Sequence, residues 1–312
     1  MRAFTLDSFD AAPGLREDLA APAVGDGDLL IRVRASSVNP VDTLIAAGVL
    51  EGMVEHEFPV VLGRDFAGVV EQAGPAVTGY AAGDEVFGWV PYAGPTVHLG
   101  TWAELIAVSH DGSVAHRPAA VGTRQAGAAP LAALTAVAAH DALGVREGTT
   151  LLVVGATGGV GSFAVQLAAR AGAVVIAPGL PEDEDYLRGL GVTEVLDRGG
   201  DLLASARARF PDGVDALLDL VSRSAEALDA YAGAVRDGGR VASPVGAAGE
   251  GPGRSNVGAV PGPDGMARLA GLLDAGDLTV PIQATHELAD AGEALEALSG
   301  RHTRGKRALT LP

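Results

Sequence analysis

The chain contains no cysteine among its 312 residues. Disulfide bonds, a thiol nucleophile and any metal site built with thiolate ligands are therefore excluded. Lysine is almost as scarce, because Lys306 is the only one and the other positive side chains are arginines. A mechanism through a lysine Schiff base or a lysine general base is not expected.

Positive charge and long apolar runs are also scarce. The 22 basic residues face 39 acidic ones, which gives a formal charge of −17, and no basic run precedes the last dozen residues. Nucleic acid would be repelled. No segment has the roughly 18 apolar residues of a membrane span, and the opening MRAFTLDSFDAAPG carries charges where a signal peptide needs an apolar core. We expect a soluble, cytoplasmic protein with no nucleic-acid or membrane partner.

Small and aliphatic residues are abundant instead. Hydrophobic residues make up 48% of the chain with only 4% aromatic, beside 44 glycines, a composition typical of helices packed on sheets. Up to about residue 122, short apolar runs broken by Gly, Pro and Asp predict a β domain. From about residue 123, short strands alternate with helical patterns, which predicts βαβ units and a parallel, doubly wound sheet.

A glycine-rich turn stands at the start of this second region. The pattern Ala156-x-Gly158-x-x-Gly161 follows a buried-type strand at 151–154 and opens a helix. Gly158 lets the backbone approach a pyrophosphate, Gly161 lets helix and strand pack closely, and the helix N-terminus attracts the phosphates. A purely structural turn is the alternative. The predicted dinucleotide turn also includes Thr157, Gly159 and Val160.

The adenine end of this predicted site is less clear. About 20 residues after the turn, an NAD site usually has an acidic residue at the tip of the second strand. Here the tip reads APGL, at 177–180, and four acidic residues follow at 182–185. Those acids would repel a 2′-phosphate, whereas Arg188 and Arg198 are candidates to bind one. The residues alone leave the choice between NADPH and NADH open.

Four blocks of the sequence carry a resemblance over nearly the whole chain: SSVNPVDTLIAAG (36–48), PVVLGRDFAGVVEQAGPAVTGYAAGDEVFG (59–88), AAPLAALTAVAAHDALGVREGTTLLVVGATGGVGSFAVQLA (128–168) and GRHTRGKRAL (300–309). The chain resembles the medium-chain dehydrogenase/reductase superfamily, in its zinc-independent quinone oxidoreductase branch, also known from zeta-crystallin. This resemblance implies an α/β fold with two domains and an active site in the cleft between them. A GroES-like β-barrel domain would span 1–122, completed by 281–312, and a Rossmann domain would span 123–280.

The resemblance also implies metal-free chemistry. Zinc-dependent relatives hold the metal at positions that match Asn39, Arg64 beside Asp65, and Leu131, a set unable to bind zinc. The implied reaction is hydride transfer from NADPH, the commoner cofactor of the family, or from NADH. The acceptor would be a quinone or the C=C bond of an α,β-unsaturated carbonyl compound, and the developing enolate needs hydrogen-bond donors and a proton.

Three residues are candidates for catalysis by this resemblance. Asn39 would donate from its amide, although an Asn-Pro pair also serves a turn. Tyr92 would donate or protonate, although a loop tyrosine can simply cover the core. Asp42 is the third candidate, and capping of the short helix VDTLIAAG is the stronger alternative for it.

Further residues would hold the cofactor. Thr135 matches a threonine that lies near the nicotinamide in the family, and a hydroxyl bonded to its own helix is the alternative. Val245 and Gly246 would add backbone contacts. Leu44 and Ala46 replace a Tyr and an Arg that are frequent in the family, so we expect an apolar small-molecule substrate.

A homodimer is implied as well. Two other functions stay open: a non-redox biosynthetic step, such as a cyclisation or isomerisation, on the same scaffold, and a binding or structural role as in lens crystallins. The intact glycine turn argues against the last.

Overall fold

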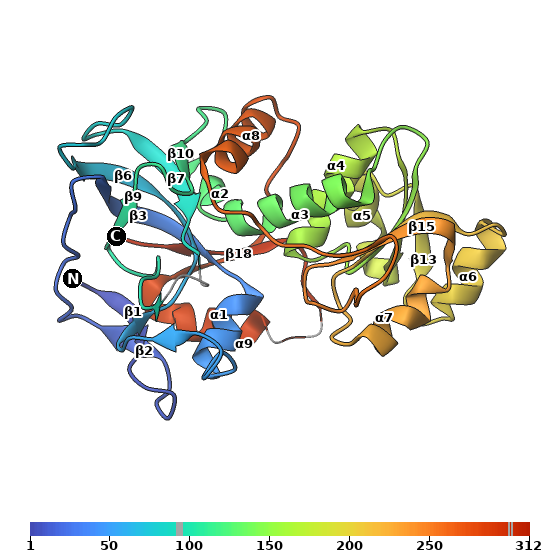
Figure 1. Ribbon diagram of the computed structural model, residues 1–312, viewed down its shortest axis with the longest axis horizontal. Helices are drawn as coiled ribbons and strands as arrows, with labels where there is room; N and C mark the ends of the chain where they lie inside the picture. The colour runs from blue at the N-terminus through green and yellow to red at the C-terminus, as the bar shows by residue number, and fades with distance from the viewer. Residues whose placement is uncertain (92–95, 299, 301) are drawn as a thin grey trace. The chain divides into compact units, whose positions relative to one another are not determined.

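The computed structural model describes residues 1–91, 96–298, 300 and 302–312. This chain divides into two compact units (Figure 1). Unit 1 comprises Met1–Leu131, Pro261–Gly276 and Val280–Pro312, and unit 2 comprises Ala132–Val260 and Asp277–Thr279. The predicted fold class, a GroES-like β domain joined to a Rossmann domain, is confirmed.

Unit 1 is built mainly of antiparallel strands. Its largest sheet has the order β10-β7-β6-β3-β18-β17, with β9 also paired to β3, and only β17 and β18 run parallel. Two smaller sheets have the orders β2-β1-β5 and β4-β8. The strands are β1 (Ala3–Leu6), β2 (Gly14–Arg16), β3 (Asp28–Val38), β4 (Glu55–His56), β5 (Val60–Val61), β6 (Asp65–Ala73), β7 (Glu85–Trp89), β8 (Thr96–Val97), β9 (Leu105–Ser109), β10 (Val114–His116), β17 (Ile282–Glu287) and β18 (Lys306–Thr310).

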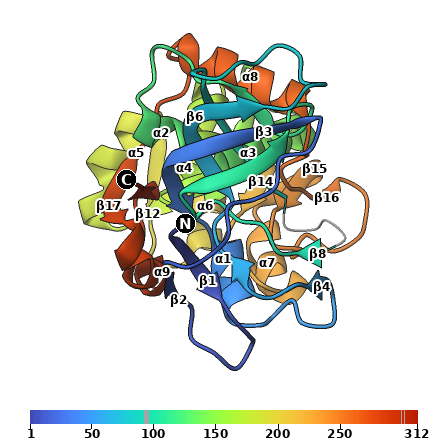
Figure 2. The same cartoon turned by 90° about the vertical axis from the view of Figure 1, so that its left-hand side faces the viewer.

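Strand β3 is central to this unit (Figure 2). Its first half alternates between buried and partly exposed residues, as expected for a strand with one face on the core. Its last four residues are all buried, where the strand leads into the polar network of the site. On one side it pairs with β6 and on the other with the C-terminal strand β18, in which Arg307 faces Val38.

Unit 2 is a six-stranded parallel sheet in the order β13-β12-β11-β14-β15-β16. Helices α4 and α5 contact each other, as do α6 and α7, and Figure 1 shows the two pairs on opposite sides of the sheet. The predicted doubly wound arrangement is therefore confirmed. Its elements are β11 (Thr150–Val154), α4 (Gly159–Arg170), β12 (Val174–Gly179), α5 (Glu184–Leu190), β13 (Glu194–Asp197), α6 (Leu202–Arg209), β14 (Val214–Asp219), α7 (Ala225–Ala232), β15 (Val235–Ser243) and β16 (Arg254–Asn256).

The units differ from the domain limits expected from the sequence. Unit 1 extends to Leu131 because α2 (Thr123–Ala126) packs on β3 and β6. It also includes α8 (Pro263–Asp274), which packs on β10, where the Gly262 N–H donates to Ser113 Oγ at 3.0 Å. The sequence pattern placed both segments in the Rossmann domain, because they follow the start of the alternating strands and helices. Their contacts place them in unit 1.

Helices α2, α6 and α9 were not among the helices expected from the sequence. Helix α6 has the sequence LLASARAR and buries only Ala206, so it lacks the apolar stripe that reveals a helix. Its N-cap Asp201 accepts from the Ala204 N–H at 2.9 Å. Helix α9 (Ala291–Leu298) follows β17. None of the described helices is both long and apolar enough to cross a membrane.

Candidate active site

The first turn of α1 (Pro40–Ala46) sets the position of Asn39. Asn39 is extended, as the residue before a proline tends to be, and Pro40 occupies the first helical position, where a missing N–H costs nothing. The carboxylate of Asp42 accepts the Asn39 backbone N–H at 2.7 Å. Asp42 is fully buried. The helix-capping role that the sequence offered for Asp42 is therefore present, which is half of a capping box.

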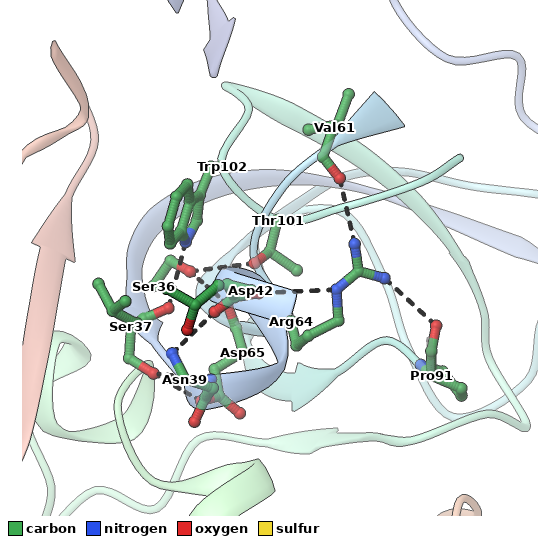
Figure 3. A network of polar contacts seen from close by, with 12 residues as sticks. Ser36, Ser37, Asn39, Asp42, Val61, Arg64, Asp65, Pro91, Thr101 and Trp102 are labelled. Carbon is green, nitrogen blue, oxygen red and sulfur yellow. Dashed lines mark hydrogen bonds and ion pairs between the residues drawn. The ribbon is translucent and has the colours of Figure 1, made fainter. Parts of the chain in front are cut away.

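The side chain of Asn39 lies between the ammonium of Lys306 and the carboxylate of Asp65, and Figure 3 shows it beside Asp65. Its Nδ2 donates to Asp65 Oδ2 at 2.9 Å, and its Oδ1 accepts from Lys306 Nζ at 2.5 Å. Ser37 Oγ lies 3.4 Å from Nδ2, on the same side as Asp65 because it is itself bonded to Asp65 Oδ2 at 2.6 Å, so both acceptors face one hydrogen of the amide. Asn39 is 3% exposed. Its amide is thus ordered by a carboxylate at one end and an ammonium at the other.

Asp65, at the start of β6, is the centre of this network. Its Oδ2 accepts from Ser37 Oγ at 2.6 Å in addition to the Asn39 amide, and its Oδ1 accepts from the Leu131 N–H at 2.7 Å. Lys306 Nζ is 3.5 Å from Oδ2. Both oxygens of a fully buried carboxylate therefore have donors, and its charge has a counter-ion.

A second buried ion pair lies beside the first. Arg64 Nε is 3.9 Å from Asp42 Oδ1, and the guanidinium donates to the Val61 carbonyl at 3.1 Å (Figure 3). Burial raises the pKa of Asp42 to about 7, against the opposing charge of Arg64. Burial lowers the pKa of Arg64, and it lowers the pKa of Lys306 against the opposing charges of Asp65 and Asp42. The network therefore holds two cations and two acidic groups away from water.

The positions matched by resemblance to zinc ligands do converge. Asn39, Asp65 and Leu131 meet through the carboxylate of Asp65. The residues do not fit a zinc ion, because donors already occupy both oxygens of Asp65 and the Lys306 ammonium lies beside it. Within the described ranges, no three His, Asp or Glu side chains are grouped so that they could hold a metal ion.

Lys306 is the site residue whose role the sequence did not reveal. It is 3% exposed and lies against Asn39. The register between the last strand and β3 explains this position of Lys306. Arg307 pairs with Val38 in the antiparallel register of β18 and β3, and continuing that register by one residue brings Lys306 opposite Asn39. That register depends on a pairing of segments far apart in the chain.

In unit 2, the glycine-rich turn has the geometry of a dinucleotide site. Strand β11 ends at Val154, and Gly158 is the N-cap of α4, so no side chain covers the first N–H groups of that helix. A Cβ on Gly161 would come within 2.7 Å of the Ala156 Cα and closer still to the Gly155 carbonyl, so only glycine permits this approach of helix to strand. The strand order changes direction at β11 and β14, the switch point at which such sheets bind ligands. The turn fits a pyrophosphate.

Two of the other predicted cofactor residues lie at the sheet edge that carries the glycine-rich turn. Val245 and Gly246 come directly after β15, at the same carboxyl edge of the parallel sheet as the turn. Val245 is 45% exposed, and Gly246 has a φ of +81° that favours glycine. Thr135 is buried on α3 (Pro130–Leu143). Tyr92 lies outside the described residues.

At the adenine end, β12 stops at Gly179 and the acidic run begins a 3₁₀ turn (Pro181–Asp183). Asp183 is not a solvated helix-start residue, because it is fully buried and its carboxylate accepts from the Leu180 N–H at 3.2 Å. The backbone N–H of Arg198 donates to the Gly179 carbonyl at 3.1 Å, which brings Arg198 to this strand tip. Arg188 is instead paired with Glu184 one turn away on α5.

Comparison with known proteins agrees with this geometry. Residues 25–119 match the family described as alcohol dehydrogenase GroES-like domain, and residues 190–309 match the family described as zinc-binding dehydrogenase. The solved structure of an alcohol dehydrogenase superfamily protein from Novosphingobium aromaticivorans is similar over 100% of both chains, with 30% identity and a TM-score of 0.86. The chain therefore belongs to the medium-chain dehydrogenase/reductase superfamily.

Within this superfamily, the chain is similar to quinone oxidoreductases. It is 36% identical over 189 residues to the chloroplastic quinone-oxidoreductase homolog of Spinacia oleracea, covering 58% of this chain and 55% of that protein. It is 32% identical over 247 residues to the mitochondrial NAD(P)H oxidoreductase RTN4IP1 of Bos taurus, covering 72% of this chain and 61% of that protein. The matched stretches thus span little more than half the length of these curated relatives.

Proposed function

We propose that the protein is a metal-independent reductase that uses NADPH or NADH to reduce a quinone or the C=C bond of an α,β-unsaturated carbonyl compound. One observation carries this proposal. The positions that would ligate a metal in zinc-dependent relatives instead form a hydrogen-bonded network around Asp65, in a chain that keeps the dinucleotide turn. A bond that is already activated suits a site without a Lewis acid.

Unit 2 binds the cofactor in this proposal. The free N–H groups and the positive dipole end of α4 hold the pyrophosphate. Gly161 permits the close approach of helix α4 to strand β11. Thr135 and the backbone at Val245 and Gly246 orient the nicotinamide ring. When bound, the reduced nicotinamide supplies the hydride.

Unit 1 supplies the polar groups. One amide hydrogen of Asn39 faces Asp65 and Ser37, and the other donates to the substrate oxygen as negative charge develops on it. Tyr92 supplies the proton or a second hydrogen bond. Asp42 serves through its contacts: it caps α1 and balances the charge of Arg64. The printed name of the spinach relative supports a quinone as acceptor.

The test is turnover by metal-depleted protein. Protein dialysed against a strong chelator is mixed with NADPH or NADH and a panel of quinones and cyclic enones, and loss of the reduced-cofactor absorbance is followed. We expect turnover with at least one acceptor, unchanged by the chelator, and none in the Gly161→Ala variant. Cofactor binding without oxidation by any acceptor would contradict the proposal and favour the non-redox alternative.

The homodimer and the cytoplasmic location stay predictions.

A further inference from the structure

The only lysine of the chain occupies a site built for a cation. Lys306 Nζ donates to Asn39 Oδ1 at 2.5 Å and to the Val38 carbonyl at 3.3 Å, and it lies 3.5 Å from Asp65 Oδ2. An ammonium has three hydrogens and accepts none, and here two oxygens accept from it while a carboxylate supplies the counter-charge. The side chain is 3% exposed.

The charge of Lys306 carries a desolvation cost. Burial opposes the charged form of Lys306 and lowers its pKa, while Asp65 favours the charged form. A whole buried ion pair can often be replaced by apolar side chains of similar volume at no loss of stability, whereas removal of one partner leaves the other charge uncompensated. Lys306 therefore balances the charge of Asp65, and any further role must lie in what the ammonium does to its other neighbours.

Its nearest neighbour is an amide that can point either way. An asparagine presents an acceptor at one end and two donors at the other, and only its hydrogen bonds decide the orientation. Lys306 binds only the oxygen end, and Asp65 binds only the nitrogen end. One orientation of Asn39 satisfies both. In that orientation one N–H faces both Asp65 Oδ2 at 2.9 Å and Ser37 Oγ at 3.4 Å, and the other N–H points away from both.

We propose that Lys306 is a positioning residue for the reaction, whose ammonium fixes the Asn39 amide so that its second N–H is held for the substrate oxygen. Hydrogen bonding of the ammonium to Oδ1 also polarises the amide and makes its N–H groups stronger donors. This inference rests on the proposed reductase function. Lys306 places a positive charge beside Asn39 and Asp65, two of the positions matched by resemblance to the metal-binding segments of zinc-dependent relatives.

The kinetic test is a double-mutant cycle between Lys306→Met and Asn39→Ala. Because Lys306 acts through Asn39, Lys306→Met lowers kcat by about 100-fold with little change in KM, the size expected for a misplaced catalytic group. In the Asn39→Ala background the same substitution causes no further loss. Arg307→Met, which removes a charge from the next residue of β18, leaves kcat unchanged. Equal losses from Lys306→Met in both backgrounds would overturn the proposal.

A second measurement does not depend on turnover. Because the chain has one lysine, ¹⁵N-lysine labelling yields a single side-chain signal, and a buried, hydrogen-bonded ammonium stays visible where an exposed one exchanges away. We expect that signal in the unaltered protein, and we expect Asn39→Ala to shift it. In Lys306→Met, the Asn39 side-chain amide signals move and exchange faster with water.

The two measurements separate the possible failures. Absence of the ammonium signal in the unaltered protein, or Asn39 signals unchanged by Lys306→Met, would overturn the positioning role even if the variants fold poorly. Intact coupling of the two signals in a protein that reduces no quinone or enone would overturn the proposed reductase function and leave the link between Lys306 and Asn39 supported.

Discussion

The carboxylate of Asp65 accepts a hydrogen bond from the backbone N–H of Leu131 at 2.7 Å, across 66 residues of sequence. Leu131 is the second residue of α3, so its N–H is one of the groups that a helix leaves unpaired at its start. A negative charge is favoured there by the helix dipole. The same carboxylate binds Ser37 and Asn39, so one buried acid joins the end of β3, the start of β6 and the first turn of a helix.

Removing this charge should be costly. Asp65→Asn leaves the Lys306 ammonium buried without its counter-ion and turns an amide NH₂ toward existing donors. We expect a loss of about 3–5 kcal/mol in the free energy of unfolding, measured by urea denaturation. The matched control is Glu71→Gln, which removes a carboxylate paired with Arg32 at the surface and should cost less than about 1 kcal/mol. Equal effects would contradict the central place of Asp65.

Asp42 should make stability depend on pH. Its pKa in the folded protein is raised to about 7, against about 3.9 in an unfolded chain, so the folded state holds this proton more tightly. The contribution of Asp42 to stability is therefore full below about pH 4 and is lost as the pH rises toward 7. Asp42→Asn should flatten the decline of the unfolding free energy across that window. An unchanged slope in the variant would show that other groups cause it.

The glycine turn gives a prediction with a matched control. Gly161→Ala places a methyl group against the backbone of Gly155 and Ala156, so we expect lower thermal stability and loss of NADPH and NADH binding in calorimetry. The control is Gly189→Ala, because Gly189 lies in α5 and a Cβ added there would meet open space. It should retain cofactor binding and raise stability by up to about 1 kcal/mol, from helix propensity. Normal cofactor affinity in Gly161→Ala would remove the turn from the site.

The choice of cofactor should depend on the strip of chain beside Gly179. The backbone N–H of Arg198 donates to the Gly179 carbonyl, and we expect its guanidinium to meet a 2′-phosphate there. We expect Arg198→Gln to weaken NADPH binding by about tenfold, equivalent to 1.4 kcal/mol, with little effect on NADH. Arg188→Gln serves as the control and should affect neither cofactor. If Arg198→Gln weakens both cofactors equally, Arg198 does not read the phosphate.

Local patterns in the sequence were sufficient for most of the fold. The alternation of strands and helices after residue 123 predicted the doubly wound sheet, and the turn at Gly158 and Gly161 lies where that pattern required. Helix α6 escaped notice because it buries a single residue. Contacts that set the limits of the units, such as Gly262 to Ser113, join distant segments and leave no local signal.

The candidate site was predictable only where its residues lie in local sequence motifs. The resemblance pointed to Asn39 and to Arg64 beside Asp65, and the chemistry of helix caps pointed to Asp42. The structure brings these residues into one polar network, and their part in catalysis stays a prediction. The role of Lys306 was not found, because it depends on the register between the last strand and β3. A lone lysine in a sequence reads as a surface residue, since burial of an ammonium is rare without a partner.

The proposed function depends above all on hydride transfer without a metal. The most direct measurement is a single turnover of chelator-treated protein with a cyclic enone and reduced cofactor that carries deuterium on the transferred position of C4. We predict that the β-carbon of the saturated product gains one deuterium for each cofactor oxidised. Product without deuterium, or product formed only after zinc is restored, would contradict the account.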